Sequence, residues 1–183
     1  TYTGGNSERS FNPAVEEYAC DVSPCVKEAE KKRITIVLEN EFNFAGPDPT
    51  ETPEGCIEII KAVNSPHFRL NFDLCNFYVA GIEPFPYSYE LVKDYIAYIH
   101  LKNAAMFIEG LHPVGVKIFE EMASHKKYIF VALGEGALNS EAFLSRLKAD
   151  RYGGYLIVEP HTEEARREEV FSKGIKYIKE KMK

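Results

Sequence analysis

Acidic and histidine side chains lie at the ends of several apolar runs that read as buried strands. Glu39 follows the run Ile34–Leu38. Asp73, His100 and Glu159 take comparable positions, with successive intervals of 34, 27 and 59 residues along the chain. A charge at the end of a buried strand costs free energy unless something pairs with it or binds it. Each acid alone is typical of a helix cap or loop charge, and His100 alone of a structural histidine. Together, the four favour a metal site.

The segments that must position these residues alternate between strand and helix patterns. We expect strands at Thr1–Gly5, Ile34–Leu38, Phe68–Phe72, Ile96–Leu101, Tyr128–Leu133 and Tyr155–Val158. We expect helices at Pro13–Lys32, with a break open at Pro24, and at Thr52–Val63, Tyr87–Tyr95, Ser140–Ala149 and Thr162–Lys181. The first half of Gly115–Val131 carries no clear pattern. This alternation predicts an α/β fold with parallel strands.

The first two spacings each fit one βα unit of roughly 30 residues, the size found when about 250 residues form a (β/α)8 TIM barrel. The third, of 59 residues, fits a unit plus an insertion around Gly115 to Gly136. In such a barrel the active site lies at the carboxyl ends of the strands, so the four side chains would meet at one rim. Three carboxylates there would repel each other. One divalent cation, Mn²⁺, Mg²⁺, Co²⁺ or Zn²⁺, with the histidine as fourth ligand would remove that repulsion.

Composition sets further bounds on function. The chain has 183 residues with 45% hydrophobic content, enough for one domain core spanning residues 1–183. The net charge of −6 does not favour a basic surface that would bind nucleic acid or an anionic membrane. No apolar run approaches the roughly 20 residues of a transmembrane helix. The four cysteines form no CxxC pair, so we expect reduced thiols and a cytoplasmic protein.

Five segments, taken in order, carry a family resemblance: ITIVLENEF, RLNFDLCNF, YIHLKNA, VALGEG and GGYLIVEPH. They resemble successive strand ends of the xylose isomerase-like TIM barrels, which include sugar isomerases and epimerases, inosose dehydratases and abasic-site endonucleases. The resemblance implies that Glu39, Asp73, His100 and Glu159 bind one divalent metal ion. It also implies metal-dependent isomerisation or epimerisation of a sugar or sugar phosphate through a cis-enediolate, with Glu39 and Glu159 as the catalytic acid/base pair.

The resemblance suggests four substrate-binding residues. Lys102 would hold a substrate oxygen, or else is a surface lysine. Asn76 stands where many ketose epimerases have a histidine, which weakens a 3-epimerase assignment because an amide does not titrate near neutral pH. Glu135 would reach a sugar hydroxyl or Lys102, or is a loop acid. His161 would face the substrate or support the metal ligands.

The opening segment TYTGG is similar to the fourth strand of the family. We therefore expect the chain to supply strands four to eight, the C-terminal portion of a barrel. Strands one to three, roughly 90 residues by the arithmetic of the fold, would then lie outside it.

Three alternatives remain open. A dehydratase begins with the same proton abstraction and then expels a hydroxyl group, and a non-catalytic sugar binder would keep the barrel without the chemistry. An abasic-site endonuclease would need further zinc ligands that Asn76 and the stretch 101–116 do not supply. The expected partner is thus a small sugar or polyol, with no nucleic acid and no membrane, and a homo-oligomer is left open.

Overall fold

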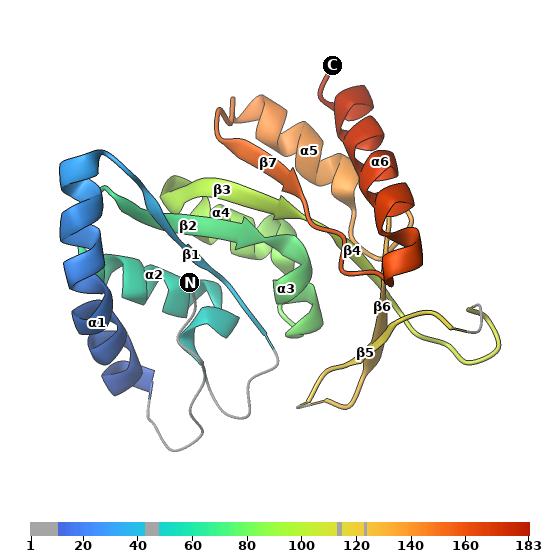
Figure 1. The fold of residues 1–183 in the computed structure, drawn as a ribbon, viewed down its shortest axis with the longest axis horizontal. Helices are drawn as coiled ribbons and strands as arrows, with labels where there is room; N and C mark the ends of the chain where they lie inside the picture. The colour runs from blue at the N-terminus through green and yellow to red at the C-terminus, as the bar shows by residue number, and fades with distance from the viewer. Residues whose placement is uncertain (1–10, 43–47, 113–114, 123) are drawn as a thin grey trace. The chain divides into compact units, whose positions relative to one another are not determined.

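The computed structural model describes residues 11–42, 48–112, 115–122 and 124–183 (Figure 1). The expected strand at Thr1–Gly5 lies outside the described residues. The chain divides into two compact units, Thr1–Ile99 and His100–Lys183.

The first unit follows a strand–helix order. Its helices are α1 (Phe11–Lys32), α2 (Pro53–Val63), α3 (Leu74–Val79) and α4 (Tyr89–Val92), with single helical turns at Pro49–Glu51, Pro84–Ser88 and Lys93–Tyr95. Its strands are β1 (Ile36–Glu39), β2 (Phe68–Asp73) and the first four residues of β3 (Ile96–Leu101). The helix α1 continues through Pro24, so the break left open there does not occur.

Parallel pairing sets the edge on which the acids of this unit lie. The strand β1 pairs parallel with β2, from Ile36 opposite Phe68 to Glu39 opposite Asn71. The strand β3 is the next neighbour of β2 in the sheet. Leu38, Leu70 and Phe72, which lie on one face of the sheet, are fully buried. Glu39 and Asp73 therefore end their strands at the same edge of the sheet.

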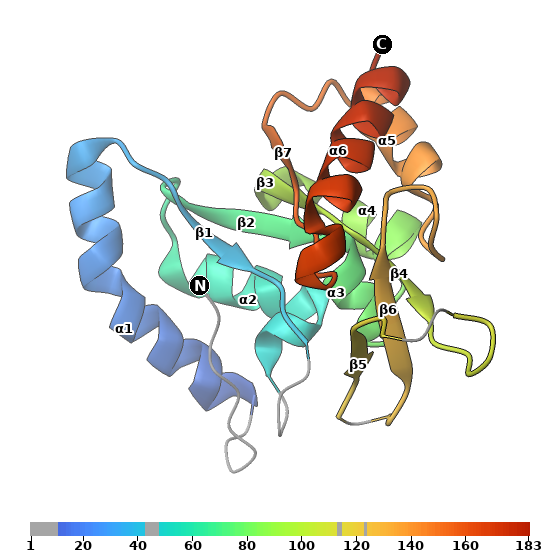
Figure 2. The same cartoon turned by 45° about the vertical axis from the view of Figure 1, so that its right-hand side comes forward.

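Local signals explain where the helices begin and end. The Thr52 hydroxyl accepts a hydrogen bond from the Gly55 amide at 3.1 Å, and Pro53 occupies the first turn of α2. The helix ends at Asn64, which adopts the left-handed conformation with φ of 51°. Figures 1 and 2 show α1 beside α2, with which it packs.

The second unit combines a βα pair with a separate sheet. Its elements are the end of β3, then β4 (Asn103–Met106), β5 (Ile118–Glu120), β6 (Lys127–Val131), α5 (Ser140–Ala149), β7 (Tyr155–Val158) and α6 (Glu164–Lys181). The strand β7 follows β3 in the sheet order, and the Glu159 amide donates to the Leu101 carbonyl at 3.1 Å. No helix in the described ranges is long and apolar enough to cross a membrane.

Residues 103–131 depart from the expected parallel arrangement. The strands β4, β6 and β5 form an antiparallel sheet in that order, with Asn103 opposite Val131 and Ile118 opposite Ile129 (Figure 2). The described parts of the links between these strands contain no crossover helix, which parallel neighbours would need. The apolar run at Tyr128–Leu133 was correctly predicted as a strand, but its periodicity carries no information on direction.

The helix α6 approaches β7 closely at one glycine. A Cβ atom on Gly174 would lie 2.8 Å from Cγ1 of Val158, closer than such atoms pack. Val170, one turn earlier, is buried on the same side of the helix. The absence of a side chain at position 174 therefore sets how near α6 lies to its strand.

We expect Gly174→Leu to lower the free energy of unfolding by about 1–3 kcal/mol through overpacking, although leucine is the better helix former. The matched control is Gly153→Leu, because nothing lies within 4 Å of a Cβ at Gly153. That variant should change stability by about 0.5 kcal/mol or less. Chemical denaturation compares them, and equal stability of the two variants would contradict the close approach.

Candidate functional site

Two carboxylates meet at the strand ends of the first unit. Glu39 is the last residue of β1 and Asp73 the last of β2. One carboxylate oxygen of each lies within 4.8 Å of the other, and Asp73 is fully buried. Two ionised carboxylates this close repel each other unless a proton or a cation lies between them. The sequence analysis predicted both residues as metal ligands.

Asp73 also caps the short helix α3. Its Oδ1 accepts hydrogen bonds from the backbone amides of Cys75 at 2.7 Å and Asn76 at 2.9 Å. A carboxylate has two oxygens, so one residue can cap a helix and ligate a cation. The helix α3 was not predicted from the sequence.

Asn40 ties the two strand ends together. Its side-chain Oδ1 accepts from the Asp73 amide at 2.8 Å, and its Nδ2 donates to the Asp73 carbonyl at 3.0 Å. The Asn76 side chain donates in turn to the Asn40 carbonyl at 2.8 Å. Both asparagines are fully buried. Oδ1 of Asn76 has no hydrogen-bond partner among the described residues.

In the second unit, three side chains converge on the Glu159 carboxylate. Lys102 Nζ lies 2.7 Å from Oε2, and His161 Nε2 lies 3.2 Å from the same oxygen. His100 Nδ1 lies 3.6 Å from Oε1. The Lys102 side chain is only 3% exposed, so its charge depends on this carboxylate for compensation. Four of the residues predicted for the site thus lie together.

These neighbours control the charge of Glu159. Burial alone would raise the pKa of this carboxyl group, but the hydrogen bond from His161 and the charge of Lys102 outweigh burial. The net result is a pKa far below the ordinary value for glutamate. Glu159 is therefore ionised at neutral pH.

Asn103 and the predicted substrate-binding residue Glu135 have neighbours of a different kind. Asn103 accepts from the backbone amides of Ala104 and Leu138 and donates to the Leu138 carbonyl and the Ser140 hydroxyl. It therefore joins β4 to the segment that leads into α5. Glu135 pairs with Lys173 of α6 at 3.1 Å, and its assignment to substrate binding stays a prediction.

Sequence reasoning missed the role of Asn40. The available signal was an amide directly after the acid that ends the strand, but the sequence pattern assigned a role to Glu39 and none to Asn40. An amide is the side chain that can both donate to and accept from a backbone.

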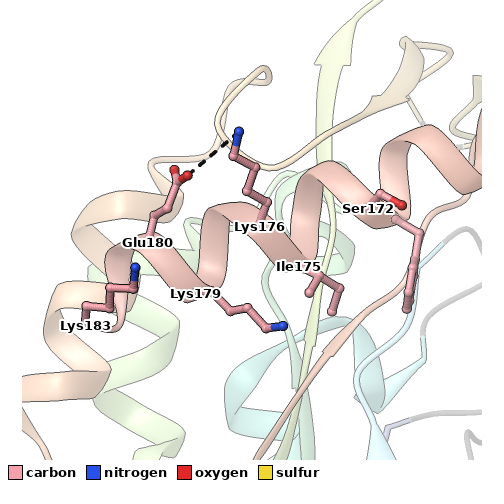
Figure 3. A pocket seen from close by; sticks show the side chains of 7 residues that line it. Ser172, Ile175, Lys176, Lys179, Glu180 and Lys183 are labelled. Atoms are coloured by element: carbon pink, nitrogen blue, oxygen red, sulfur yellow. Dashed lines mark ion pairs between the residues drawn. The ribbon is translucent and has the colours of Figure 1, made fainter.

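A hollow elsewhere in the second unit contains none of the predicted residues. Figure 3 shows it along α6, where Phe171 and Ile175 line about 420 Å³ together with Lys176, Lys179 and Lys183. Lys176 pairs there with Glu180 at 4.0 Å. Its lining carries lysine charges, apolar surface and one carboxylate, that of Glu180, and none of the four residues predicted as metal ligands, so it is not the candidate site.

Comparisons with known proteins identify the family and the fold of the chain. The family model described as "Xylose isomerase-like TIM barrel" matches residues 2–181. The uncharacterised protein MJ1311 of Methanocaldococcus jannaschii is 26% identical over 166 residues, which are 88% of this chain and 49% of that protein. The chain thus spans about half the length of this curated relative.

Solved structures share the fold. The IOLI protein with a bound zinc atom is 20% identical with a TM-score of 0.70, covering 97% of this chain and 59% of its own. An L-ribulose 3-epimerase is 14% identical with a TM-score of 0.69, covering 98% and 57%. A probable 3-DHS dehydratase, AsbF, of Bacillus anthracis is 18% identical with a TM-score of 0.68, covering 92% and 57%.

The bonds of Asn103 lead to a prediction on stability. We expect Asn103→Ala to lower the free energy of unfolding by about 1–3 kcal/mol or more, because buried backbone groups of Ala104 and Leu138 lose their partner. Asn139→Ala is the control, since Asn139 makes one exposed cap bond to the Ala142 amide and should cost about 1 kcal/mol. Urea denaturation measures both, and a cost for Asn103→Ala no greater than that for Asn139→Ala would refute the bracing role.

Proposed function

The chain belongs to the xylose isomerase-like TIM barrel family, and we propose that it is a sugar isomerase or epimerase that depends on one divalent cation. The observation that carries the proposal is the pair of carboxylates, Glu39 and Asp73, whose oxygens lie within 4.8 Å of one another. Such a pair at strand ends is stabilised by a cation. The zinc atom in the IOLI protein and the epimerase among the solved structures support this choice.

We propose Glu39, Asp73, His100 and Glu159 as the ligands of this cation. Each offers a carboxylate oxygen or an imidazole nitrogen. Such mixed oxygen and nitrogen ligation fits Mn²⁺, Mg²⁺, Co²⁺ or Zn²⁺. The three carboxylates would carry three negative charges against the two positive charges of the ion, and the Lys102 ammonium group beside Glu159 would offset the third. The low pKa of Glu159 matches a group that binds as an anion. The residues therefore fit the group that the family implies.

The chemistry we propose is transfer of a proton next to a sugar carbonyl. A bound divalent cation would stabilise the negative charge that develops on the substrate oxygens as the proton leaves carbon. Glu39 and Glu159 would be the two acid/base groups, one removing a proton from carbon and the other returning it. Isomerisation and epimerisation share this half-reaction and differ in the carbon that is reprotonated.

The remaining residues would orient the substrate. The Lys102 ammonium group, held 2.7 Å from Glu159, would donate to a substrate oxygen while keeping that carboxylate in place. His161, whose ring lies edge-on to Phe130 at 5.3 Å, would bind a hydroxyl beside it. Oδ1 of Asn76, which has no partner in the described part of the chain, would accept a hydrogen bond from a hydroxyl or a water, and Glu135 would bind at the rim.

A dehydratase is the second candidate. Its support is the fold similarity to the probable 3-DHS dehydratase. Such an enzyme would use the same proton abstraction and then expel a hydroxyl group, so its product would lack one water. A sugar-binding protein without catalysis is the third reading.

Elemental analysis of the purified protein tests the metal site. We expect about one divalent metal ion per chain, lost in Glu159→Gln and His100→Ala because each removes a ligand. The matched controls are Glu120→Gln and His125→Ala, an exposed pair joined at 3.2 Å in the second unit, which should keep the metal. No metal after reloading would refute the proposal, and three zinc ions would indicate an abasic-site endonuclease.

Incubation with ketoses in D₂O tests the reaction. We expect metal-dependent incorporation of deuterium at a carbon next to the carbonyl, observed by NMR and abolished by a chelator. An isomerised or epimerised product identifies the proposed class, and a product lacking one water identifies the dehydratase. Sugar binding without deuterium incorporation would leave a binding protein.

A further inference from the structure

We propose that Asn40 and Asn76 are positioning residues that hold Glu39 and Asp73 at the separation a divalent cation requires. This inference rests on the proposed metal site and adds residues that do not themselves touch the cation. The residues Asn40, Asp73 and Asn76 with the hydrogen bonds among them are called the Asn40 network below.

The Asn40 network is a closed set of four hydrogen bonds. Asn40 exchanges two with the backbone of Asp73, at 2.8 and 3.0 Å. Asn76 donates from its side-chain amide to the Asn40 carbonyl at 2.8 Å. It also donates from its backbone N–H to Asp73 Oδ1 at 2.9 Å. All three residues are 0% exposed, so water does not compete for these bonds.

The first pair of bonds imitates the pairing of one strand with another. Backbone pairing of β1 with β2 ends with Glu39 opposite Asn71. The Asn40 side chain then presents an acceptor and a donor to the amide and carbonyl of Asp73, as a neighbouring peptide group would. It thereby continues the ladder beyond the last backbone pair.

This placement fixes the backbone of both proposed ligands. Asn40 is joined to Glu39 by one peptide bond, so holding Asn40 against Asp73 holds the two carboxylates near each other. The same network fixes Oδ1 of Asp73 toward the amides of Cys75 and Asn76. The rotation of the Asp73 carboxylate is thus set, and with it the direction of its second oxygen.

The network also fixes the orientation of the Asn76 amide. Because the Asn40 carbonyl can only accept, the group facing it must be the Asn76 NH₂. Oδ1 of Asn76 is therefore directed elsewhere, and it has no partner among the described residues. An unsatisfied buried acceptor costs free energy. The bond that the Asn76 NH₂ group donates to Asn40 is a structural reason for an amide at position 76 despite this cost.

Removing a residue that hydrogen-bonds to a metal ligand typically weakens metal affinity by about 10–100-fold. We expect Asn40→Ala to raise the Kd for Mn²⁺ by about that factor, because it removes both bonds to Asp73. Asn76→Ala removes one bond and leaves the Asn40–Asp73 pair, so its Kd should rise by a smaller factor. Isothermal titration with Mn²⁺ alone gives each Kd.

The control for a purely structural effect is Ser88→Ala. Ser88 is fully buried in the same unit and donates from its hydroxyl to the Glu83 carbonyl at 2.6 Å. Its loss should lower the melting temperature measured in chelator, with the Kd for Mn²⁺ unchanged. Comparison with Asn40→Ala therefore separates lost stability from lost positioning.

The electron paramagnetic resonance spectrum of bound Mn²⁺ gives a second readout. A loosened ligand pair should change its line shape in Asn40→Ala, whereas Ser88→Ala should leave the spectrum as in the wild type. If Asn40→Ala does not fold, Asn76→Ala answers the question with the same measurements.

The outcomes separate the two proposals. Wild-type protein that binds no Mn²⁺ overturns both the metal site and the positioning role. Wild-type protein that binds Mn²⁺, with unchanged Kd and spectrum in the folded Asn40 and Asn76 variants, overturns the positioning role alone. A graded loss of affinity, larger for Asn40→Ala than for Asn76→Ala and absent in Ser88→Ala, supports it.

Discussion

The parallel pairing of β1 with β2 is the constraint on which the acids of the first unit depend. Parallel strands end at the same edge of a sheet, so two acids at the ends of adjacent strands become neighbours even though 34 residues separate them in the sequence. The fully buried Leu38, Leu70 and Phe72 fix the register, since a slip by one residue would turn these side chains away from the core. The core therefore sets the position of Glu39 and Asp73, and the Asn40 side chain refines it.

The second unit handles buried charge in a different way. Glu159 follows β7, and its backbone is held to the end of β3 by the bond to Leu101. Its carboxylate is surrounded by one ammonium group and two imidazoles. Burial would raise the pKa of this carboxyl group, but His161 and Lys102 lower it. Removing Glu159 would leave Lys102 as a buried cation without this partner, which is costly. The two groups therefore depend on each other, and Glu159 supports the local structure as well as any chemistry.

The strand ends were predictable because their pattern is local. The bounds of β3, β7 and α5 agree with the apolar runs and caps that predict them, and the α/β class follows from the alternation of elements. The antiparallel sheet of β4, β6 and β5 was not predicted, because pairing direction depends on contacts between segments rather than on periodicity. The helix α3 was missed because its six residues follow β2 without a loop, and Asp73 is both strand end and cap. The Asn40 network joins residues 33 and 36 positions apart, and no short stretch of sequence reveals such bonds.

In the Asn40 network, positions 40 and 73 call for different side chains. One must bond the backbone, and the other would bind the proposed cation. At position 73 an asparagine or serine would cap α3 as well as aspartate does, so capping alone does not explain a fully buried carboxylate. At position 40 the reverse holds, because an aspartate could accept from the Asp73 amide but could not donate to its carbonyl. The charge thus stands where a cation would use it, and the neutral amide stands where the backbone needs both a donor and an acceptor. Backbone bonding therefore accounts for the amide at position 40, whereas the carboxylate at position 73 is the group that the proposed cation site would use.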